Sequence, residues 1–493
     1  MMRASSGDGT GDIRELLEVG VACLPQRGEI SCFTTAAKQL VEEVFAEVHP
    51  ERLPLRFLLL LTTADWCDTS RPLSKEVRDE IYQRLKYKVP LIGGSMARLF
   101  CSKARKFVME QGVVLVAFCS RDFWMTVETL DKPHEKSPDD RREAVELLAK
   151  SLEQTAGIRL GTSASKHLLG IFPGIYGGEL GQLHYRDNEL HEEILSAFSY
   201  HYPLIGTGAA NSLNATSGYQ FANDKCLSSS LALAIVESDL AWGTRMGHGF
   251  LANREFCIAV DGLKDGAEAG YEVEILDGKP AAARLCELQE THSTAGGGLF
   301  LGLPTGEDYY VIRTLDGSAE KAQGCVRLTR RVRKGDRLYV LCAEKESQEW
   351  AAQSIMQGAF GSAETPSEAM KLIWGMSCTG RLALLNALQI RWEERVHKLA
   401  TLYPGVPLIG GLCGGEFGID QWGRAQANTF SFLASCIASA HSNRAKNREL
   451  QRQLIGAAGR LSMCSAPREV MEAALQDGQR QLFLSLATII ICP

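Results

Sequence analysis

A short motif, Pro-Leu-Ile-Gly, occurs three times in this chain and constrains its fold more than any other feature. It stands at residues 90–93, 203–206 and 407–410. Proline is excluded from helix interiors, Leu-Ile reads as a short buried strand, and glycine lets the backbone turn sharply or approach another group closely. Each copy is therefore predicted as the end of a helix, a short strand and then a glycine corner.

The segments around the motif repeat as well. An apolar run precedes each copy, a segment rich in Arg, Glu and Leu fills the gap as a predicted helix, and a second apolar run follows. The recurrence of motif and flanks in a fixed order indicates three related structural units, each strand, helix, motif, loop and strand. The apolar runs lie at 55–61, 168–172 and 372–376 before the motifs, and at 113–118, 231–236 and 429–434 after them.

The region from 242 to 347 differs in kind. Short strand-like segments alternate there with Asp-Gly and Gly-Asp turn signals, and a helix is expected at 280–289. The predicted fold class is α/β, with mixed layered sheets and packed helices built from three repeated strand-helix-strand units, a strand-rich subdomain and a C-terminal helical extension. The predicted organisation is a disordered leader (1–17), an N-terminal half (18–240), a C-terminal half (241–440), and a helical linker with the start of a truncated domain (441–493).

Charge and cysteine usage narrow the functional class. A net charge of −6 argues against a general nucleic-acid or anionic-membrane binder. The 15 cysteines include no C-x-x-C pair, which favours a reducing cytoplasm. No apolar run reaches the roughly 20 residues of a membrane helix. The apolar end at 482–493 is expected to be the first strand of a further domain, with a truncated membrane segment as the alternative.

The most suggestive constellation for binding lies around the third motif. Ser377–Arg381 ends a predicted strand and opens a helix, so hydroxyls, a thiol and backbone N–H groups would be exposed where an anion such as a carboxylate binds. Arg381 would add a bidentate contact. A helix cap with a buried cysteine explains the pattern equally well. Cys413–Gly418 follows the third motif, and if the two strands are neighbours both loops meet at one rim, where α/β sheets favour ligands.

Two other residues offer alternatives. His248 stands between Gly247 and Gly249, which predicts an exposed ring that serves either as a haem or metal ligand or as a simple hydrogen-bonding group. Cys378 as a nucleophile needs a base within reach, and His397 on the following helix is expected to point elsewhere. The sequence contains no nucleophile elbow, P-loop, H-E-x-x-H or kinase signature, so we predict that the chain is not an enzyme.

Taken together, the motifs resemble those of the FIST proteins, the "F-box and intracellular signal transduction" sensory domains. The segment Gly270–Ala281 resembles the start of the family's C-terminal half, while Ser377–Arg381 and Pro407–Gly411 with Gly414-Gly415-Glu416 are similar to its closing motifs. The resemblance covers about residues 20–440. It implies a bacterial-type intracellular sensory module that binds a small ligand, with amino acids suggested for the family. Some relatives bind haem and sense nitric oxide, and the tail at 453–492 is similar to the start of a GAF-type domain.

The predicted function is a cytoplasmic, non-enzymatic sensor that binds an amino acid or similar ligand and relays occupancy through a C-terminal helix. No metal or cofactor is expected. The alternatives are a haem-based nitric-oxide sensor and a thiol enzyme using Cys378. Expected partners are a signalling output domain or protein of the kinase or cyclic-dinucleotide enzyme class and a second copy through the C-terminal helix, but neither nucleic acid nor membrane. The predicted ligand-binding residues are Gly206, His248, Ser377, Cys378, Arg381, Gly410, Gly411, Gly414, Gly415 and Glu416.

Overall fold

The structure is a computed structural model of the chain, and it describes the greater part of residues 16–442. The predicted leader up to residue 15, the predicted linker helix and the GAF-like start beyond residue 442 lie outside the described residues. The described ranges are 16–24, 32–156, 165–174, 176–177, 183–184, 187–212, 218–264, 270–292, 299–305, 310–314, 324–328, 330–421, 424–428 and 431–442.

Three six-stranded sheets share one order of strand pairing. In each sheet the third and fourth strands are parallel and the remaining neighbours are antiparallel. The first sheet consists, in order, of β1 (Leu17–Leu24), β6 (Val113–Ser120), β2 (Leu55–Thr62), β3 (Leu91–Ser95), β12 (Tyr219–Ala222) and β13 (Lys225–Ser228). The second consists of β7 (Phe123–Leu130), β14 (Leu231–Ser238), β8 (Ser165–Phe172), β11 (Leu204–Gly208), β25 (Glu416–Ile419) and β26 (Ala425–Asn428). The third consists of β15 (Leu240–Gly247), β27 (Phe432–His441), β23 (Met370–Cys378), β24 (Leu408–Cys413), β4 (Arg98–Cys101) and β5 (Val108–Met109).

The three units exchange hairpins in a closed cycle. The hairpin that follows each Pro-Leu-Ile-Gly strand does not join that strand's own sheet. The β4–β5 hairpin of the first unit completes the third sheet, β12–β13 of the second unit completes the first sheet, and β25–β26 of the third unit completes the second sheet. Each sheet is therefore incomplete without residues from a different unit.

The three sheets share a central core because their inner strands bury both faces, as β2 shows. In β2, Phe57, Leu59 and Leu61 point into a core cluster that holds residues of all three sheets. The alternate residues Leu58 and Leu60 instead face helices on the outside of the first sheet. A strand buried on both faces reads as an unbroken apolar run, which explains the run at 55–61.

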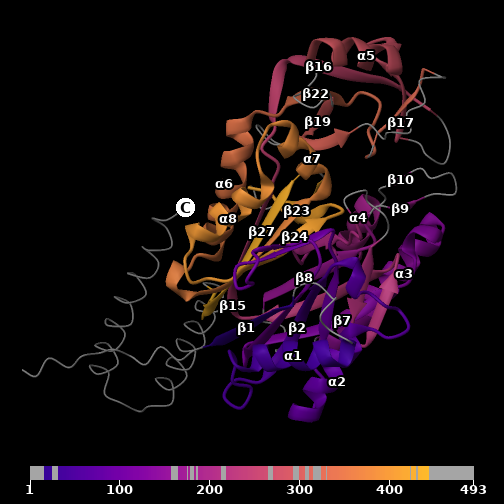
Figure 1. Ribbon diagram of the computed structural model, residues 1–493. Coiled ribbons are helices and arrows are strands. Elements are labelled where there is room, and N and C mark those ends of the chain that lie inside the picture. Colours follow the sequence, from indigo (N-terminus) through magenta and orange to yellow (C-terminus); the bar gives the residue numbers. More distant parts are fainter. Residues whose placement is uncertain are drawn as a thin grey trace, which may run out of the picture. The chain divides into compact units, whose positions relative to one another are not determined.

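Helices cover the outer face of each sheet, as Figure 1 shows for α6 and α8 beside β23, β24 and β27. Separate clusters of apolar side chains join each set of helices to its sheet. The first sheet carries α1 (Phe33–Phe45) and α2 (Leu73–Leu85), and the second carries α3 (Pro138–Ala156) and α4 (Asp187–Ala197). The third carries α6 (Lys345–Ala363), α7 (Thr379–Ala387) and α8 (Trp392–Leu402).

A strand-rich subdomain with its own apolar core is inserted between β15 and α6. The predicted strands and the single predicted helix of this region are confirmed, with somewhat different bounds. Its elements are β16 (Leu251–Leu263), β17 (Glu272–Leu276), β18 (Lys279–Pro280), α5 (Ala281–His292), β19 (Phe300–Pro304), β20 (Tyr310–Thr314), β21 (Val326–Arg327) and β22 (Arg337–Cys342). A separate pair of short strands consists of β9 (Tyr176–Gly177) and β10 (Leu183–His184).

The predicted α/β class with mixed sheets is confirmed, and several elements were not predicted. Strand β1 begins at Leu17, within the expected leader, and its register follows β6 along its whole length. The sequence analysis also missed α6, because its alternation of charged and small residues lacks a sharp apolar stripe. Among the described residues, no helix combines the length and apolar character needed to cross a bilayer.

Candidate functional site

The two motifs predicted to share a rim do lie side by side. Strands β23 and β24 run parallel, with Ser377 opposite Leu412 and Cys378 opposite Cys413. Parallel neighbours end at the same edge of a sheet, so the segments after both strands start from adjacent positions. Strand β25 then leaves this edge and pairs with β11, which sets Glu416 opposite Thr207 and places Gly206 opposite Phe417. Residues from the second and third units therefore meet here.

Backbone hydrogen bonds join all three units at this edge. The Gly208 N–H donates to the Gly415 carbonyl at 2.9 Å, and the Gly414 N–H donates to the Gly208 carbonyl at 2.8 Å. The Ala210 N–H donates to the Ser95 carbonyl at 2.9 Å, linking the second unit to the first. The third unit is linked to the first because the Ala97 N–H donates to the Leu412 carbonyl at 2.9 Å. The carboxyl ends of the three motif strands thus form a continuous hydrogen-bonded ring.

The glycines of the motifs lie within strands, which corrects the predicted glycine corners. Gly410 and Gly411 are both part of β24. A Cβ atom on Gly410 would stand 1.6 Å from the Gly375 carbonyl oxygen, and a Cβ atom on Gly206 would stand 2.3 Å from the Gly170 carbonyl oxygen. Close approach of the parallel neighbour strand, rather than a sharp turn, therefore requires glycine at these positions.

Glu416 is fully buried beside this edge. Its Oε1 accepts a hydrogen bond from the Cys413 thiol at 3.1 Å, and its Oε2 accepts one from the Ser431 hydroxyl. Burial raises the pKa of the Glu416 carboxyl to about 8, against the opposing effects of these bonds and of the positive charge of Arg381. At neutral pH the carboxyl is therefore mostly protonated and neutral.

Arg381 is also buried, so its predicted role at an exposed helix N-terminus is corrected. Its guanidinium turns toward α6, where Nη2 donates to the side-chain oxygen of Gln348 at 3.1 Å. Arg395 of α8 donates to the backbone carbonyl of the same Gln348. Burial lowers the pKa of Arg381 to about 10, and burial together with the charge of Arg381 lowers the pKa of Arg395 to about 9. Two guanidinium groups thus converge on one glutamine in a dry environment.

This arginine pair is incompletely satisfied. Within the described part of the chain, Nη1 of Arg381 and Nη1 of Arg395 are buried and make no hydrogen bond. The charges of Glu416 and Glu349 act on Arg381 and Arg395, respectively, without a direct ion pair among the described residues. Buried charges in proteins are normally paired. Gln348 and Arg395 were not predicted, because Gln348 lies on a helix that was not expected and because no motif marks Arg395 on α8.

Of the two interpretations of Ser377–Arg381, the structure agrees with the helix cap and buried cysteine, because Ser377 and Cys378 are both buried. Cys378 is the N-cap of α7 without a capping bond from its side chain. Its backbone N–H donates to the Ser431 carbonyl at 3.3 Å. His397 lies on α8 and packs edge-on against Phe107, as predicted away from Cys378. The hairpin β25–β26, which follows the neighbouring strand β24, leaves this edge and pairs with β11 of the second sheet.

The expected exposure of the His248 ring is also wrong. His248 is 4% exposed, its Nδ1 accepts a hydrogen bond from the Phe250 N–H at 2.9 Å, and its Nε2 bonds the Tyr310 carbonyl at 2.8 Å. Burial, together with the positive charge of Arg381, lowers the pKa of His248 to about 4. The ring is therefore neutral with the proton on Nε2, and iron ligation by His248 would require one of these two bonds to break.

A second buried carboxyl at this edge escaped the sequence analysis. Asp187, at the start of α4, accepts a hydrogen bond from the Gly174 N–H at 2.8 Å and bonds Nε2 of His134 at 2.7 Å. Burial raises the pKa of Asp187, and the histidine opposes that shift. A Cβ atom on Gly208 would lie 3.4 Å from this carboxylate, so the pair flanks the ring of motif strands. Among the described residues, no group of three or more His, Cys, Asp or Glu side chains is arranged to hold a metal ion.

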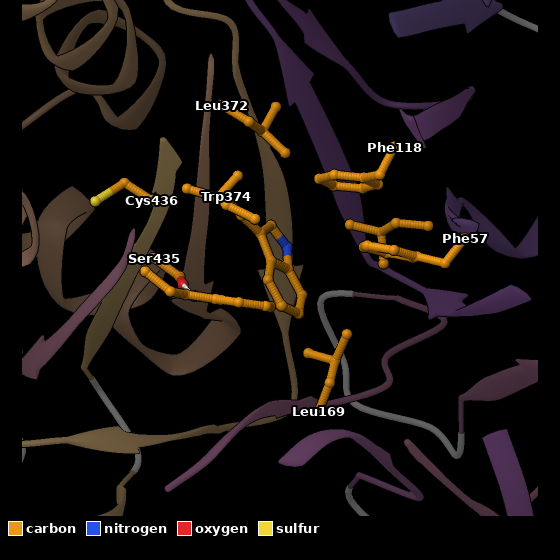
Figure 2. Close-up of a pocket in the computed structure, with 10 residues that line it drawn as sticks. Phe57, Phe118, Leu169, Leu372, Trp374, Ser435 and Cys436 are labelled. Atoms are coloured by element: carbon orange, nitrogen blue, oxygen red, sulfur yellow. Dashed lines mark hydrogen bonds between the residues drawn. The ribbon is translucent and has the colours of Figure 1, made fainter. Parts of the chain in front are cut away.

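The central core contains a small apolar cavity. Figure 2 shows Phe57 and Phe118 facing Trp374, with Leu169 and Leu372 beside them. The volume of the cavity is about 20 Å³, which is room for a single water molecule. Trp242 separates this cavity from an open groove of about 550 Å³ that Arg245 and Tyr202 also line. The groove lies at the strand starts of the second sheet, away from the ring.

Comparison with known proteins identifies two domains. Residues 34–256 match the family model of the FIST N domain, and residues 281–419 match that of the FIST C domain. None of the curated proteins compared with the chain matches it. Solved structures include a cyanuric acid hydrolase from A. caulinodans, 10% identical, covering 46% of this chain and 71% of that one with a TM-score of 0.22. A second cyanuric acid hydrolase structure, also 10% identical, covers 45% and 69% with a TM-score of 0.23. TM-scores this low do not establish a shared fold with either hydrolase.

Proposed function

Because the chain belongs to the FIST family, whose domains are signal-transduction sensory domains, we propose that it senses a small carboxylate-bearing ligand, an amino acid or similar molecule. The proposed site lies where β23, β24 and α7 meet, with Arg381 and Glu416 as its charged groups. The proposal assigns no catalytic step to Cys378 or to any other residue.

The observation that supports this proposal is the buried arginine pair. Arg381 and Arg395 hold two positive charges out of water, and each keeps an unbonded Nη1 among the described residues. Leaving such charges unpaired is costly, and a carboxylate binds a guanidinium through two parallel hydrogen bonds. A ligand carboxylate at Arg381 would supply the anion that the described side chains do not.

Glu416 gives the proposed site a carboxyl group in addition to the guanidinium group of Arg381. Its carboxyl interacts with the charge of Arg381, yet at neutral pH it is mostly protonated and leaves the arginine uncompensated. An amino acid carries an ammonium group beside its carboxylate. We propose that this ammonium binds Glu416 and that the carboxyl releases its proton as it does so. The arrangement favours a zwitterion over a simple monocarboxylic acid.

The proposed output is a change in how the protein contacts its signalling output domain or partner protein. Ligand binding would order the strand ends and favour one of two conformations, since a ligand shifts an equilibrium only through its different affinities for the two states. The relay through a C-terminal helix to a signalling output domain or protein remains part of this proposal, as does the cytoplasmic location. The residues expected to form that helix lie outside the described ones.

A thermal-shift screen of the full chain against the amino acids tests the proposed function, with an absorption spectrum recorded on the same sample. Binding to the folded state stabilises it by about 2.7 kcal/mol at a hundredfold excess over Kd. We expect one compound or a chemically related group to raise Tm, and Arg381→Gln to abolish that rise. The matched control is Arg245→Gln, which changes a partly buried arginine in the groove at the other end of the second sheet.

Each result has a distinct meaning. A rise in Tm lost only in Arg245→Gln would move the site to the groove and overturn its placement at Arg381. The absence of any rise with all amino acids, together with a Soret band, would replace the amino-acid sensor by the haem alternative. Isothermal titration in buffers of different ionisation enthalpy then tests the role of Glu416, because a zwitterionic ligand is expected to release close to one proton near neutral pH.

A further inference from the structure

Cys23 and Cys101 form a sulfur–sulfur contact between two sheets. Cys23 lies on β1 in the first sheet, and Cys101 lies on β4, which belongs to the third sheet. Their Sγ atoms are 2.7 Å apart although the residues stand 78 positions apart in the sequence. A disulfide bond is about 2.05 Å long, so a movement of well under 1 Å would bring the two sulfurs to bonding distance.

The surroundings of this pair favour a thiolate. The Cys101 sulfur accepts a hydrogen bond from the Cys23 thiol and further ones from the backbone N–H groups of Lys103 and Ala104. These bonds, with the positive charge of Lys103, lower the pKa of Cys101 in spite of its burial. Cys23 is the hydrogen-bond donor, and its pKa is correspondingly raised. The Cys23 thiol therefore stabilises the thiolate of Cys101 by donating a hydrogen bond to it, as in reactive dithiols.

The pair is also within reach of a small oxidant. Cys101 is fully buried, whereas Cys23 is partly exposed. The turn that follows Cys101 carries Lys103, Arg105 and Lys106. Lys103 favours anionic sulfur at Cys101, although its ammonium is also paired with the Glu47 carboxylate at 2.6 Å. An oxidant that reaches one sulfur finds the second already in contact with it.

We propose that Cys23 and Cys101 are a redox-active dithiol that hydrogen peroxide converts to a disulfide. One sulfur attacks a peroxide oxygen and breaks the O–O bond, giving a sulfenic acid and one water. The second sulfur then displaces the hydroxyl group, which takes up the remaining thiol proton and leaves as a second water. Two thiols are oxidised by two electrons and one peroxide is reduced to two waters.

The disulfide would tie the first sheet to the third. Strand β4 pairs with β24, with Cys101 opposite Ile409 and Phe100 opposite Gly410. Oxidation would therefore tie β1 to β4, the neighbour of the motif strand β24. The inference stands on the cysteine pair alone and is independent of the proposed amino-acid ligand.

A second cysteine pair provides a matched control. Cys67 and Cys226 are also hydrogen-bonded to each other beside the first sheet, but burial raises the pKa of Cys67 well above its ordinary value. A thiol held in its protonated form reacts slowly with peroxide. This pair therefore has a thiol–thiol hydrogen bond like that of Cys23 and Cys101, but the charge that acts on Cys67 is the Asp65 carboxylate instead of a lysine ammonium. Cys67 also contacts the Thr62 hydroxyl at 3.3 Å.

The test treats the reduced full chain with hydrogen peroxide, blocks the remaining thiols and maps disulfide-linked peptides by mass spectrometry. We expect a peptide pair joining residues 23 and 101, lighter by two hydrogens, that a dithiol reductant restores. Cys23→Ser and Cys101→Ser should each abolish it, while Cys67→Ser should leave it unchanged. Because mapping of the unaltered chain needs no variant, a folding defect in either serine variant does not weaken the test.

Other outcomes overturn the proposal. Peroxide that leaves residues 23 and 101 as free thiols while other cysteines oxidise would show that contact and local charge do not make this pair reactive. Cys101 found only as sulfenic or sulfinic acid, with Cys23 reduced, would show that the second sulfur cannot complete the bond. A link between residues 67 and 226 that forms while residues 23 and 101 stay unlinked would show that the surroundings of Cys101 do not select this pair.

Discussion

At the residue scale, the candidate site depends on charges that burial alters. Glu416 is mostly neutral near pH 7 because its carboxyl is fully buried, although a thiol and a hydroxyl both donate to it. Arg381 keeps its charge because even its lowered pKa of about 10 lies well above neutral pH. A carboxyl and a guanidinium near each other would ordinarily neutralise one another. Here burial prevents this, and the arginine keeps its capacity for another anion.

Glu416→Gln is expected to change how stability depends on pH. The folded-state pKa of about 8 lies above the ordinary value of 4.5, so the folded protein holds a proton that the unfolded chain has released between these values. The contribution of Glu416 is fully present below about pH 4.5 and is lost as pH rises to about 8, with a slope of up to about 1.4 kcal/mol per pH unit. The Gln variant keeps a neutral group and should lack this slope.

Urea unfolding across this pH range measures the difference between the two proteins. The free energy of unfolding of the unaltered protein should fall relative to that of the Gln variant as pH rises. Glu368→Gln, at an exposed position, is the control and should follow the unaltered protein. Parallel pH profiles for the unaltered protein and Glu416→Gln would contradict the raised pKa.

At the element scale, the motif glycines allow neighbouring parallel strands to pack. Gly93 in β3, Gly206 in β11 and Gly410 in β24 each face a backbone oxygen of the adjacent parallel strand at a distance that excludes a Cβ atom. The equivalent close approach in all three units explains why the motif ends in glycine each time. The motif is thus a packing feature of the sheets, and the polar residues that follow the strands distinguish one unit from another.

Gly410→Ala is expected to lower the free energy of unfolding by about 3 kcal/mol or more. The new Cβ atom would meet the Gly375 oxygen at 1.6 Å, and the backbone φ of +153° is rarely adopted by other residues. The control is Gly361→Ala within α6, where a Cβ atom meets nothing within 4 Å. That substitution should gain up to about 1 kcal/mol from helix propensity. Equal stabilities of the two variants in urea unfolding would contradict the packing role.

At the scale of the whole molecule, the exchanged hairpins make the three units interdependent. The two family domains match separate stretches of the sequence, yet β25 of the second domain and β26, which follows it, complete a sheet whose other strands belong to the first domain. In the other direction, β4 and β5 complete a sheet whose neighbouring strand is β24. One central core then includes side chains from all three sheets. The described residues between 16 and 442 form one compact unit.

We therefore expect that residues 1–264 do not fold alone into a native-like protein. Such a fragment exposes the inner faces of two sheets and the pairing edges of β11 and β15, which favours aggregation or a loosely packed state. Co-expression with residues 265–442 should restore a soluble complex. Size-exclusion chromatography and near-UV circular dichroism compare the fragment, the pair and the chain 1–442, which should fold by itself. A monomeric fragment with native-like near-UV signal would contradict this interdependence.

The sequence by itself determined the repeated unit, the α/β class and most helices and strands, because these follow from local patterns. These patterns are the positions of prolines, the apolar runs and the spacing of glycines. They depend on neighbouring residues, so they can be interpreted without knowledge of the tertiary structure. The same logic predicted that Ser377–Arg381 and Cys413–Gly418 meet at one rim if their strands are neighbours, and the parallel pairing of β23 with β24 meets that condition. Their burial could not be read in this way, because it depends on where the next hairpin goes.

Only the tertiary structure decided which residues share the site and in which ionisation state. Gln348 and Arg395 come to Arg381 from separate helices, and Cys101 comes to Cys23 across 78 positions. The exchanged hairpins also joined Glu416 to the second unit instead of its own sheet. Each of these pairings depends on desolvation and on contacts between distant segments. A sequence pattern does not predict these pairings, because the same residue types also occur at many positions where their side chains remain exposed to water.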